Sequence, residues 1–222
     1  NSPRDSLRYA GCNIFYNEKV KLRARVLTQA IPFREGDLFS QSKMQKTYDN
    51  YNRLRALRYT NVRFTEMPED SLGLWLQVYT DNNKFQSFSI EVEGTNSAGD
   101  LGAALVTTYS HRNIFKGSET FSVKLRGAYE AITGLEGYSR SDYVELGAEA
   151  SLSFPRCIFP YAPHSFLQDS KAISEMSLQY NMQNRPEFRR RVASWIWRYR
   201  WNSRGNKQSN RFDVINLNFV YM

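Results

Sequence analysis

The sequence predicts an N-terminal α+β domain over residues 7–80, followed by an all-β region over residues 84–222. In the first part, one stretch repeats its apolar residues every three or four positions, which is the spacing of a helix face. In the second part, apolar and polar residues alternate, which is the spacing of a strand with two different faces. The turn-forming cluster Asp81-Asn82-Asn83 separates them.

The first part is predicted to follow the order β-α-α-β-β. Its elements are a strand at 7–16, a short helix at 22–29 before Pro32, a longer helix at 40–57, and strands at 59–65 and 72–79 joined by a turn at 67–70. Ser40 is the expected cap of the longer helix. The apolar face of that helix is Met44, Tyr48, Tyr51, Leu54 and Leu57.

The second part predicts seven antiparallel strands, each with one apolar and one polar face. They are expected at residues 85–94, 101–110, 121–130, 144–153, 176–183, 194–201 and 212–221. Strands in soluble proteins average ~5–6 residues, whereas a tilted strand needs ~9–11 to cross a bilayer. The length of these strands, their charged faces and the stripe Trp195, Trp197, Trp201 favour the first part of a transmembrane β-barrel. A soluble antiparallel sandwich with one wet face per sheet stays open.

Composition allows anionic partners, because the formal charge is +8 and the pI is about 9.5. No recognition fold surrounds the basic run Arg189-Arg190-Arg191, so we expect no nucleic-acid binding. Cys12 and Cys157 are far apart and only His111 and His164 could join them, which indicates neither a zinc site nor a disulfide framework. Neither a nucleophile motif nor a phosphate loop is present, so we expect no enzymatic activity and no cofactor.

Small residues cluster at the start of the second predicted strand. Gly99, Gly102, Ala103 and Ala104 are expected to permit close approach and local bending of strands. The segment Arg112-Asn113-Ile114-Phe115-Lys116-Gly117 is predicted to be the turn between the second and third strands. Asn113 and Gly117 are expected to serve turn geometry, glycine where a positive φ is required and asparagine where it is tolerated.

Several of these stretches resemble a known family. EGTNSAGDLGAALVTTYSHRNIFKGSE, the strand end Phe154-Pro155-Arg156 and the run Asn184-Arg185-Pro186-Glu187-Phe188 resemble the first barrel strands of the BamA/TamA superfamily of outer-membrane assembly factors, and most of all its Bacteroidetes TamA-like members. GDLFS before the long helix and LRALRYTNVRF after it resemble a polypeptide-transport-associated (POTRA) domain, the last before such a barrel.

The resemblance implies a protein that accepts unfolded outer-membrane proteins in the periplasm and inserts them into the outer membrane. The POTRA domain is then periplasmic and offers strand edges to clients or to periplasmic and lipoprotein accessory factors. The first barrel strand is implied to form one side of a lateral gate. The implied gate residues are Phe85, Ser87, Phe88, Ser89, Ile90, Glu91, Val92 and Glu93, and the implied turn motif is Arg112, Asn113, Phe115 and Gly117.

Seven strands are fewer than the roughly eight of the smallest bacterial outer-membrane barrels, so we expect the chain to be the N-terminal part of a longer protein. Two alternatives stay open: a two-partner polypeptide secretion pore and a soluble β-rich surface protein. Glu91 and Glu93 serve either gating or a solvated lumen. Arg189, Arg190 and Arg191 either contact lipopolysaccharide phosphate or line the lumen.

Overall fold

The computed structural model describes residues 4–68, 70–97, 100–131, 143–158, 172–185, 188–202 and 208–222. The chain forms two compact units. Unit 1 contains residues 1–85 and 112–119, and unit 2 contains residues 86–111 and 120–222. The chain therefore passes between the units at three points. The prediction of a mostly antiparallel β structure with few helices is confirmed.

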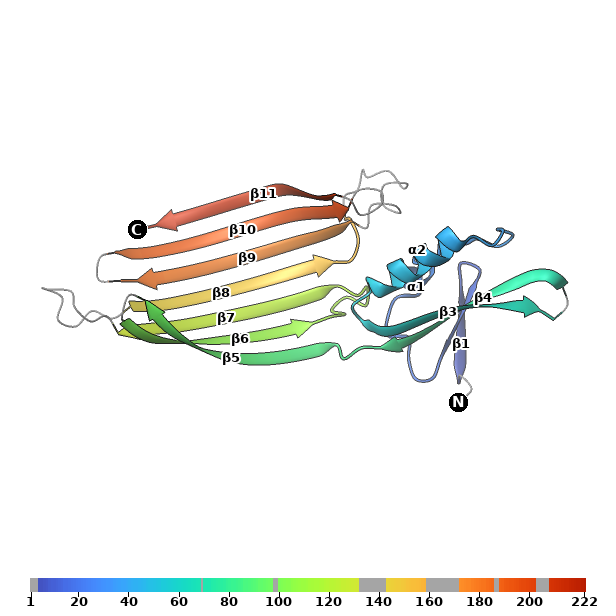
Figure 1. Cartoon of the computed structure of the whole chain (residues 1–222), viewed down its shortest axis with the longest axis horizontal. Helices are drawn as coiled ribbons and strands as arrows, with labels where there is room; N and C mark the ends of the chain where they lie inside the picture. The colour runs from blue at the N-terminus through green and yellow to red at the C-terminus, as the bar shows by residue number, and fades with distance from the viewer. Residues whose placement is uncertain are drawn as a thin grey trace, which may run out of the picture. The chain divides into compact units, whose positions relative to one another are not determined.

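Unit 1 has six elements of secondary structure. They are β1 (Asp5–Tyr9), β2 (Cys12–Tyr16), α1 (Ala24–Gln29), α2 (Gln41–Asn52), β3 (Leu57–Met67) and β4 (Asp70–Asn82) (Figure 1). β1 pairs with β2, and β3 pairs with β4, each pair being antiparallel. The described strands of unit 1 thus make two separate two-stranded sheets.

The single strand predicted at residues 7–16 is wrong, because these residues form a hairpin. Ala10 and Gly11 adopt φ values of 48° and 79°, and a two-residue turn with both φ positive matches the natural twist of a hairpin. The observed order is β-β-α-α-β-β, and β1–β2 forms a sheet of its own. The POTRA arrangement is therefore not confirmed.

The long helix and its cap are confirmed, although the helix is shorter than predicted. The Ser40 hydroxyl accepts a hydrogen bond from the Lys43 N–H at 3.4 Å, and the helix ends at Asn52 instead of Leu57. The core of unit 1 is formed by Ala30, Tyr51 and Leu54. The buried Tyr51 hydroxyl donates to the Leu27 carbonyl at 2.9 Å, and burial raises its pKa.

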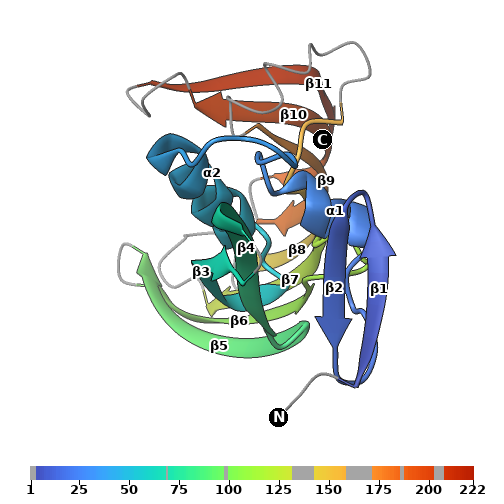
Figure 2. The ribbon, with the colours of Figure 1, turned by 90° about the vertical axis from the view of Figure 1, so that its right-hand side faces the viewer.

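Unit 2 is a seven-stranded sheet, as predicted. Its strands are β5 (Gln86–Ser97), β6 (Asp100–His111), β7 (Thr120–Ala131), β8 (Tyr143–Phe154), β9 (Ile173–Asn184), β10 (Arg189–Asn202) and β11 (Ser209–Tyr221). Each strand pairs antiparallel with the next along the chain, so β5 and β11 are the two edges. Seen from its end, the sheet is an open arc (Figure 2). The described strands do not close into a barrel.

Candidate functional site

The register of unit 2 divides its side chains between two faces, because directly opposed residues of paired strands point to the same side. We call one the apolar face. Its larger side chains include Phe88, Ile90, Val92, Leu105, Leu125, Leu146, Leu178, Trp195, Leu217 and Phe219. We call the opposite face the polar face. The carboxylates of the unit 2 strands whose side chains the structure describes lie there: Glu91, Glu93, Glu130, Glu145, Glu149, Glu175 and Asp213.

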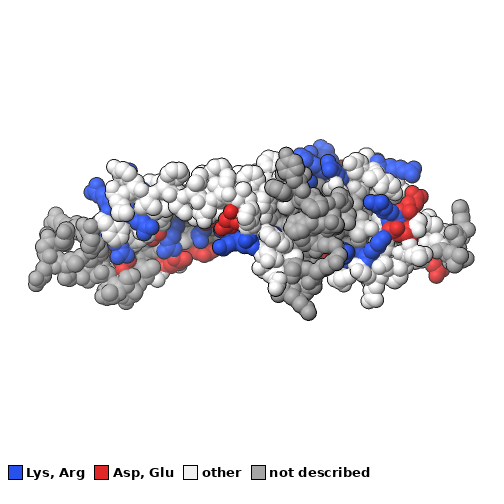
Figure 3. Space-filling view, turned by 90° about the horizontal axis from the view of Figure 1, so that it is seen from above, with Lys and Arg blue, Asp and Glu red and all other residues white. Residues whose placement is uncertain are grey.

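Many of the larger side chains of the apolar face are open to solvent in the part of the chain that the structure describes. The exposed fractions are 78% for Val92, 66% for Phe219, 63% for Phe88 and 60% for Ile90 and Leu178. Figure 3 shows charged side chains gathered along one side of the strand region, while the opposite side is largely without charge. Burying one such side chain is worth roughly 1.5–3 kcal/mol, so a face of this extent favours an apolar partner.

The predicted gate residues lie at one edge of this sheet. Ser87 to Glu93 belong to β5, whose neighbour among the described strands is β6. The outer edge of β5 thus carries backbone N–H and C=O groups without a sheet partner there. Phe85 comes before the strand and belongs to unit 1, where its carbonyl accepts from the Arg112 N–H at 2.7 Å.

A chain of polar contacts ties β5 to the strands beyond its neighbour. Arg126 of β7 donates to the Glu93 carboxylate at 2.7 Å, and its Nε lies 3.9 Å from a Glu145 oxygen on β8. Glu145 also accepts from the Asn181 amide of β9 at 2.8 Å and from the Tyr143 hydroxyl at 2.8 Å. Four strands are therefore linked on the polar face.

The small residues of β6 divide between the faces. Ala104 lies on the polar face, opposite Glu93 on one side and Ala128 on the other, and is only 3% exposed. Val106, two residues further along β6, lies opposite Arg126, so the bond from Arg126 to Glu93 crosses β6 diagonally between Ala104 and Val106. Ala103 lies on the apolar face and is exposed, and Gly99 is outside the described residues. The predicted role of these residues in strand bending stays a prediction.

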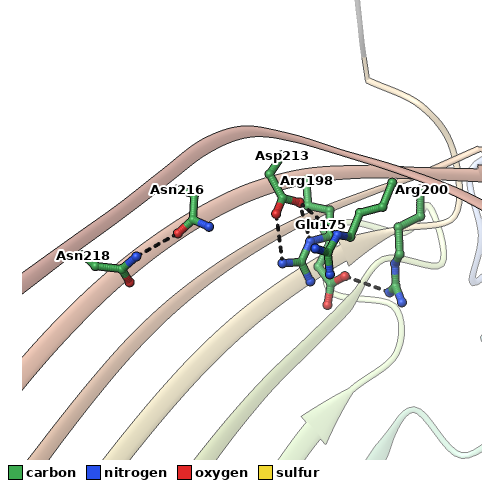
Figure 4. A network of polar contacts seen from close by, with 7 residues as sticks. Glu175, Arg198, Arg200, Asp213, Asn216 and Asn218 are labelled. Carbon is green, nitrogen blue, oxygen red and sulfur yellow. Dashed lines mark hydrogen bonds and ion pairs between the residues drawn. The ribbon is translucent and has the colours of Figure 1, made fainter.

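A second polar cluster lies near the other edge (Figure 4). The Arg198 Nε donates to Asp213 of β11 at 2.7 Å, and Arg200 donates to Glu175 of β9 at 2.7 Å. Asn218 donates to Asn216 at 3.1 Å along β11. On the polar face, arginines thus pair with carboxylates of neighbouring strands.

The segment Arg112–Glu119 joins β6 to β7, as predicted, and we call it the junction turn. It packs within unit 1. The Asn113 amide donates to the Lys21 carbonyl at 2.9 Å, and its oxygen accepts from the Ser118 N–H at 3.1 Å. The Ser118 hydroxyl accepts from the buried Ala56 N–H at 2.9 Å, and the Lys116 carbonyl accepts from the Arg23 N–H at 2.7 Å.

The expected reason for Gly117 and Asn113 is wrong. The positive φ values of this turn occur at Lys116 (60°) and Ser118 (63°). A Cβ at Gly117 would instead overlap the Glu119 carboxylate, which accepts from the Gly117 N–H at 2.8 Å. Ser118 and Glu119, exposed by only 1% and 2%, were not singled out from the sequence. The only indication of them in the sequence is that two polar residues stand between Gly117 and the alternating pattern of the next strand.

The remaining residues of the predicted motifs lie in different parts of the structure and do not form one site. Phe115 is half exposed on the junction turn. Arg189, Arg190 and Arg191 begin β10 and are exposed, with Arg189 and Arg191 on the apolar face and Arg190 on the polar face. His111 ends β6, whereas His164, Pro186 and Glu187 lie outside the described residues.

The described residues contain no cluster of three or more metal-ligating side chains. None of the described helices has both the length and the apolar character needed to span a bilayer. Cys12 and Cys157 are free thiols, and burial raises the pKa of Cys12.

Neither a family model nor a curated protein matches the sequence. Two of the solved structures that match the chain share 10% sequence identity with it. CdiB from Acinetobacter baumannii gives a TM-score of 0.47 over 90% of this chain and 44% of its own. BamA from Haemophilus ducreyi lacking POTRA domains 1–3 gives a TM-score of 0.38 over 87% and 46%. The chain spans less than half the length of each, and neither likeness is close enough to assign a family.

Proposed function

We propose that the chain is part of an outer-membrane protein assembly factor of the BamA/TamA superfamily, of the TamA-like type. Unit 1 acts as a periplasmic POTRA-type domain that receives unfolded outer-membrane proteins. The apolar face of unit 2 contacts the hydrocarbon of the bilayer, and β5 forms one side of a lateral gate. The sequence motifs at residues 93–119 and 184–188 are the basis for this family.

The observation that carries the proposal is the position of β5. It is the edge strand of a sheet with one exposed apolar face and one charged face. An unpaired backbone group in hydrocarbon costs several kcal/mol, because no water is there to bond it. A strand of a client protein that pairs with β5 satisfies these groups, so the edge can template insertion without an energy-yielding cofactor.

The membrane part of the proposal is tested with neighbouring residues on opposite faces. Ile90 and Glu91 are both exposed on β5, and the register places them on the apolar and polar faces respectively. A single cysteine at Ile90, in a chain with Cys12 and Cys157 replaced by serine, should react with a membrane-confined maleimide in vesicles. A cysteine at Glu91 should react only with a water-soluble maleimide. The reverse pattern would contradict the assignment of the faces.

The lateral-gate part of the proposal is tested with an unfolded client protein. A photo-crosslinker at Ser89 of the edge strand should capture an unfolded barrel protein during its assembly. The same crosslinker at Ser151, in the interior strand β8, is the control and should capture none, because β8 already has two neighbours. Equal capture at both positions would rule out templating at β5. A captured polypeptide that is finally released outside the membrane would indicate a secretion pore instead.

A further inference from the structure

The apolar face carries full charges at one place in the described strands. Following the register from β5 to β11, the Lys, Arg, Asp and Glu side chains fall on the polar face, with the exception of Arg189 and Arg191. Two arginines on one face, two residues apart, lie about 7 Å from each other along the strand. No described carboxylate of the sheet shares their face.

These arginines border directly on the apolar surface. Arg191 lies opposite Met182 of β9 and Tyr221 of β11, and the next row inward is Tyr180, Ala193 and Phe219. The Arg189 Nε donates to the Asn184 side-chain oxygen at 3.1 Å, and no hydrogen bond joins its two terminal nitrogens to the described residues. Such a place suits a molecule with an anionic head and an apolar body.

The register also defines which end of the sheet this is. Arg189 lies opposite Asn184, which lies opposite Val144, and the row continues through Tyr129 and Ala103 to Gly94 near the end of β5. The junction turn joins β6 and β7 at the opposite end of those strands. If unit 1 is periplasmic, as proposed above, the arginines reach the outer leaflet.

We infer that Arg189 and Arg191 form a binding site for the phosphate of a lipid headgroup, with the acyl chains of that lipid lying on the adjacent apolar face. Guanidinium groups bind phosphate with two parallel charge-assisted hydrogen bonds, and a long side chain at the end of a membrane strand reaches the headgroup layer. The lumen-lining alternative applies to Arg190 alone, because Arg190 is on the polar face. This inference rests on the proposed function.

Arg190 provides the matched control, with the same charge, strand and exposure on the opposite face. The probe is diphosphorylated lipid A, titrated into the full chain in neutral detergent. The double variant Arg189→Gln/Arg191→Gln should bind lipid A at least about tenfold more weakly, and Arg190→Gln should stay within about twofold of the unmodified chain. Dephosphorylated lipid A should bind the unmodified chain as weakly as lipid A binds the double variant.

The inference is overturned if the double variant keeps its affinity, or if Arg190→Gln loses as much. Strand content by circular dichroism and association with neutral phosphatidylcholine vesicles are measured for every variant. A chain that fails to associate with neutral vesicles contradicts the proposed function, and this inference with it. A chain that associates normally but shows no preference for phosphorylated lipid A contradicts this inference alone.

Discussion

The Arg126 guanidinium of β7 lies 2.7 Å from the Glu93 carboxylate of β5, although β6 runs between the two strands. On β6, Ala104 lies opposite Glu93 and Val106 lies opposite Arg126, so the contact crosses β6 diagonally between these two positions. The edge strand is therefore held by its backbone bonds to β6 and, in addition, by a side chain that comes from two strands away. If β5 moves when the proposed gate opens toward clients, this ion pair resists the movement, and its strength then influences how easily the strand opens.

Removing the ion pair should loosen the end of β5. Because both partners are partly exposed, with side-chain exposures of 32% and 43%, we expect Arg126→Gln or Glu93→Gln to cost only about 0.2–1 kcal/mol. The loss should appear as faster amide hydrogen exchange at Val92 to Gly94. Glu91→Gln is the control, since Glu91 is on the same strand and face but no ion pair joins it to the described residues. Equal effects of Glu91→Gln and Glu93→Gln would contradict the specific role of the pair.

Ala104 should tolerate no large side chain. Ala104 is nearly buried and lies beside Glu93 on the polar face, so Ala104→Leu is expected to disturb the contact between Arg126 and Glu93 and to cost about 1–3 kcal/mol from overpacking. Ala103→Leu, one residue earlier on the exposed apolar face, is expected to change stability little. Denaturant unfolding of the two variants in detergent makes the comparison. The idea fails if both substitutions are tolerated equally.

The junction turn should be sensitive at Ser118. Ser118→Ala leaves the buried Ala56 N–H without its acceptor, and an unsatisfied buried donor costs about 1–3 kcal/mol. Thermal unfolding monitored by protease resistance of unit 1 should show the loss. Lys116→Gly is the contrasting substitution, because Lys116 has a φ of 60° that glycine adopts without strain, and its backbone bond to Arg23 remains. A Lys116→Gly variant less stable than Ser118→Ala would contradict this account.

Replacing Gly117 is expected to destabilise the junction turn for a reason other than backbone conformation. Gly117→Ala places a methyl group against the buried Glu119 carboxylate and should destabilise unit 1 by roughly 1–3 kcal/mol. If the clash is the cause, Gly117→Ala should cost much less when it is introduced beside Glu119→Ala. Additive losses in this double-mutant cycle, measured by the same protease assay, would instead indicate strain in the backbone.

Alternation and length were sufficient to predict seven antiparallel strands, because an apolar row such as Phe88, Ile90 and Val92 defines a face whatever lies beyond it. The hairpin at Ala10-Gly11 was missed because alanine rarely supplies a positive φ, so the usual asparagine-glycine pair was absent. The contacts of the junction turn were not predictable either. The Asn113 amide donates a hydrogen bond to the Lys21 carbonyl, and the Ser118 hydroxyl accepts one from the Ala56 N–H. Both pairs are distant in the sequence, and no repeating pattern of residues indicates them.

The pH dependence of unit 1 should include Asp37. Its carboxylate accepts from the Arg34 N–H at 2.8 Å and from the Lys43 ammonium, and the bond from Lys43 is the main reason that its pKa is lowered. A pKa lowered by folding means that the stabilisation is complete above the unfolded value of about 3.9 and is lost as the pH falls through the lower folded value. Carboxyl carbon NMR should therefore show that the pKa of Asp37 lies below that of an ordinary aspartate.

Lys43→Gln separates the two sources of this effect. The variant keeps the bond from the Arg34 backbone but loses the ammonium, so the pKa of Asp37 should rise toward its ordinary value. Lys43 also lies over the Phe33 ring, 5.7 Å from its centroid, and Phe33 and Phe39 both pack edge-on against Phe64. Aromatic proton shifts of Phe33 should therefore change in the same variant. An Asp37 titration that stays as low as in the unmodified chain would show that the Arg34 N–H, and not Lys43, holds the carboxylate in its charged form.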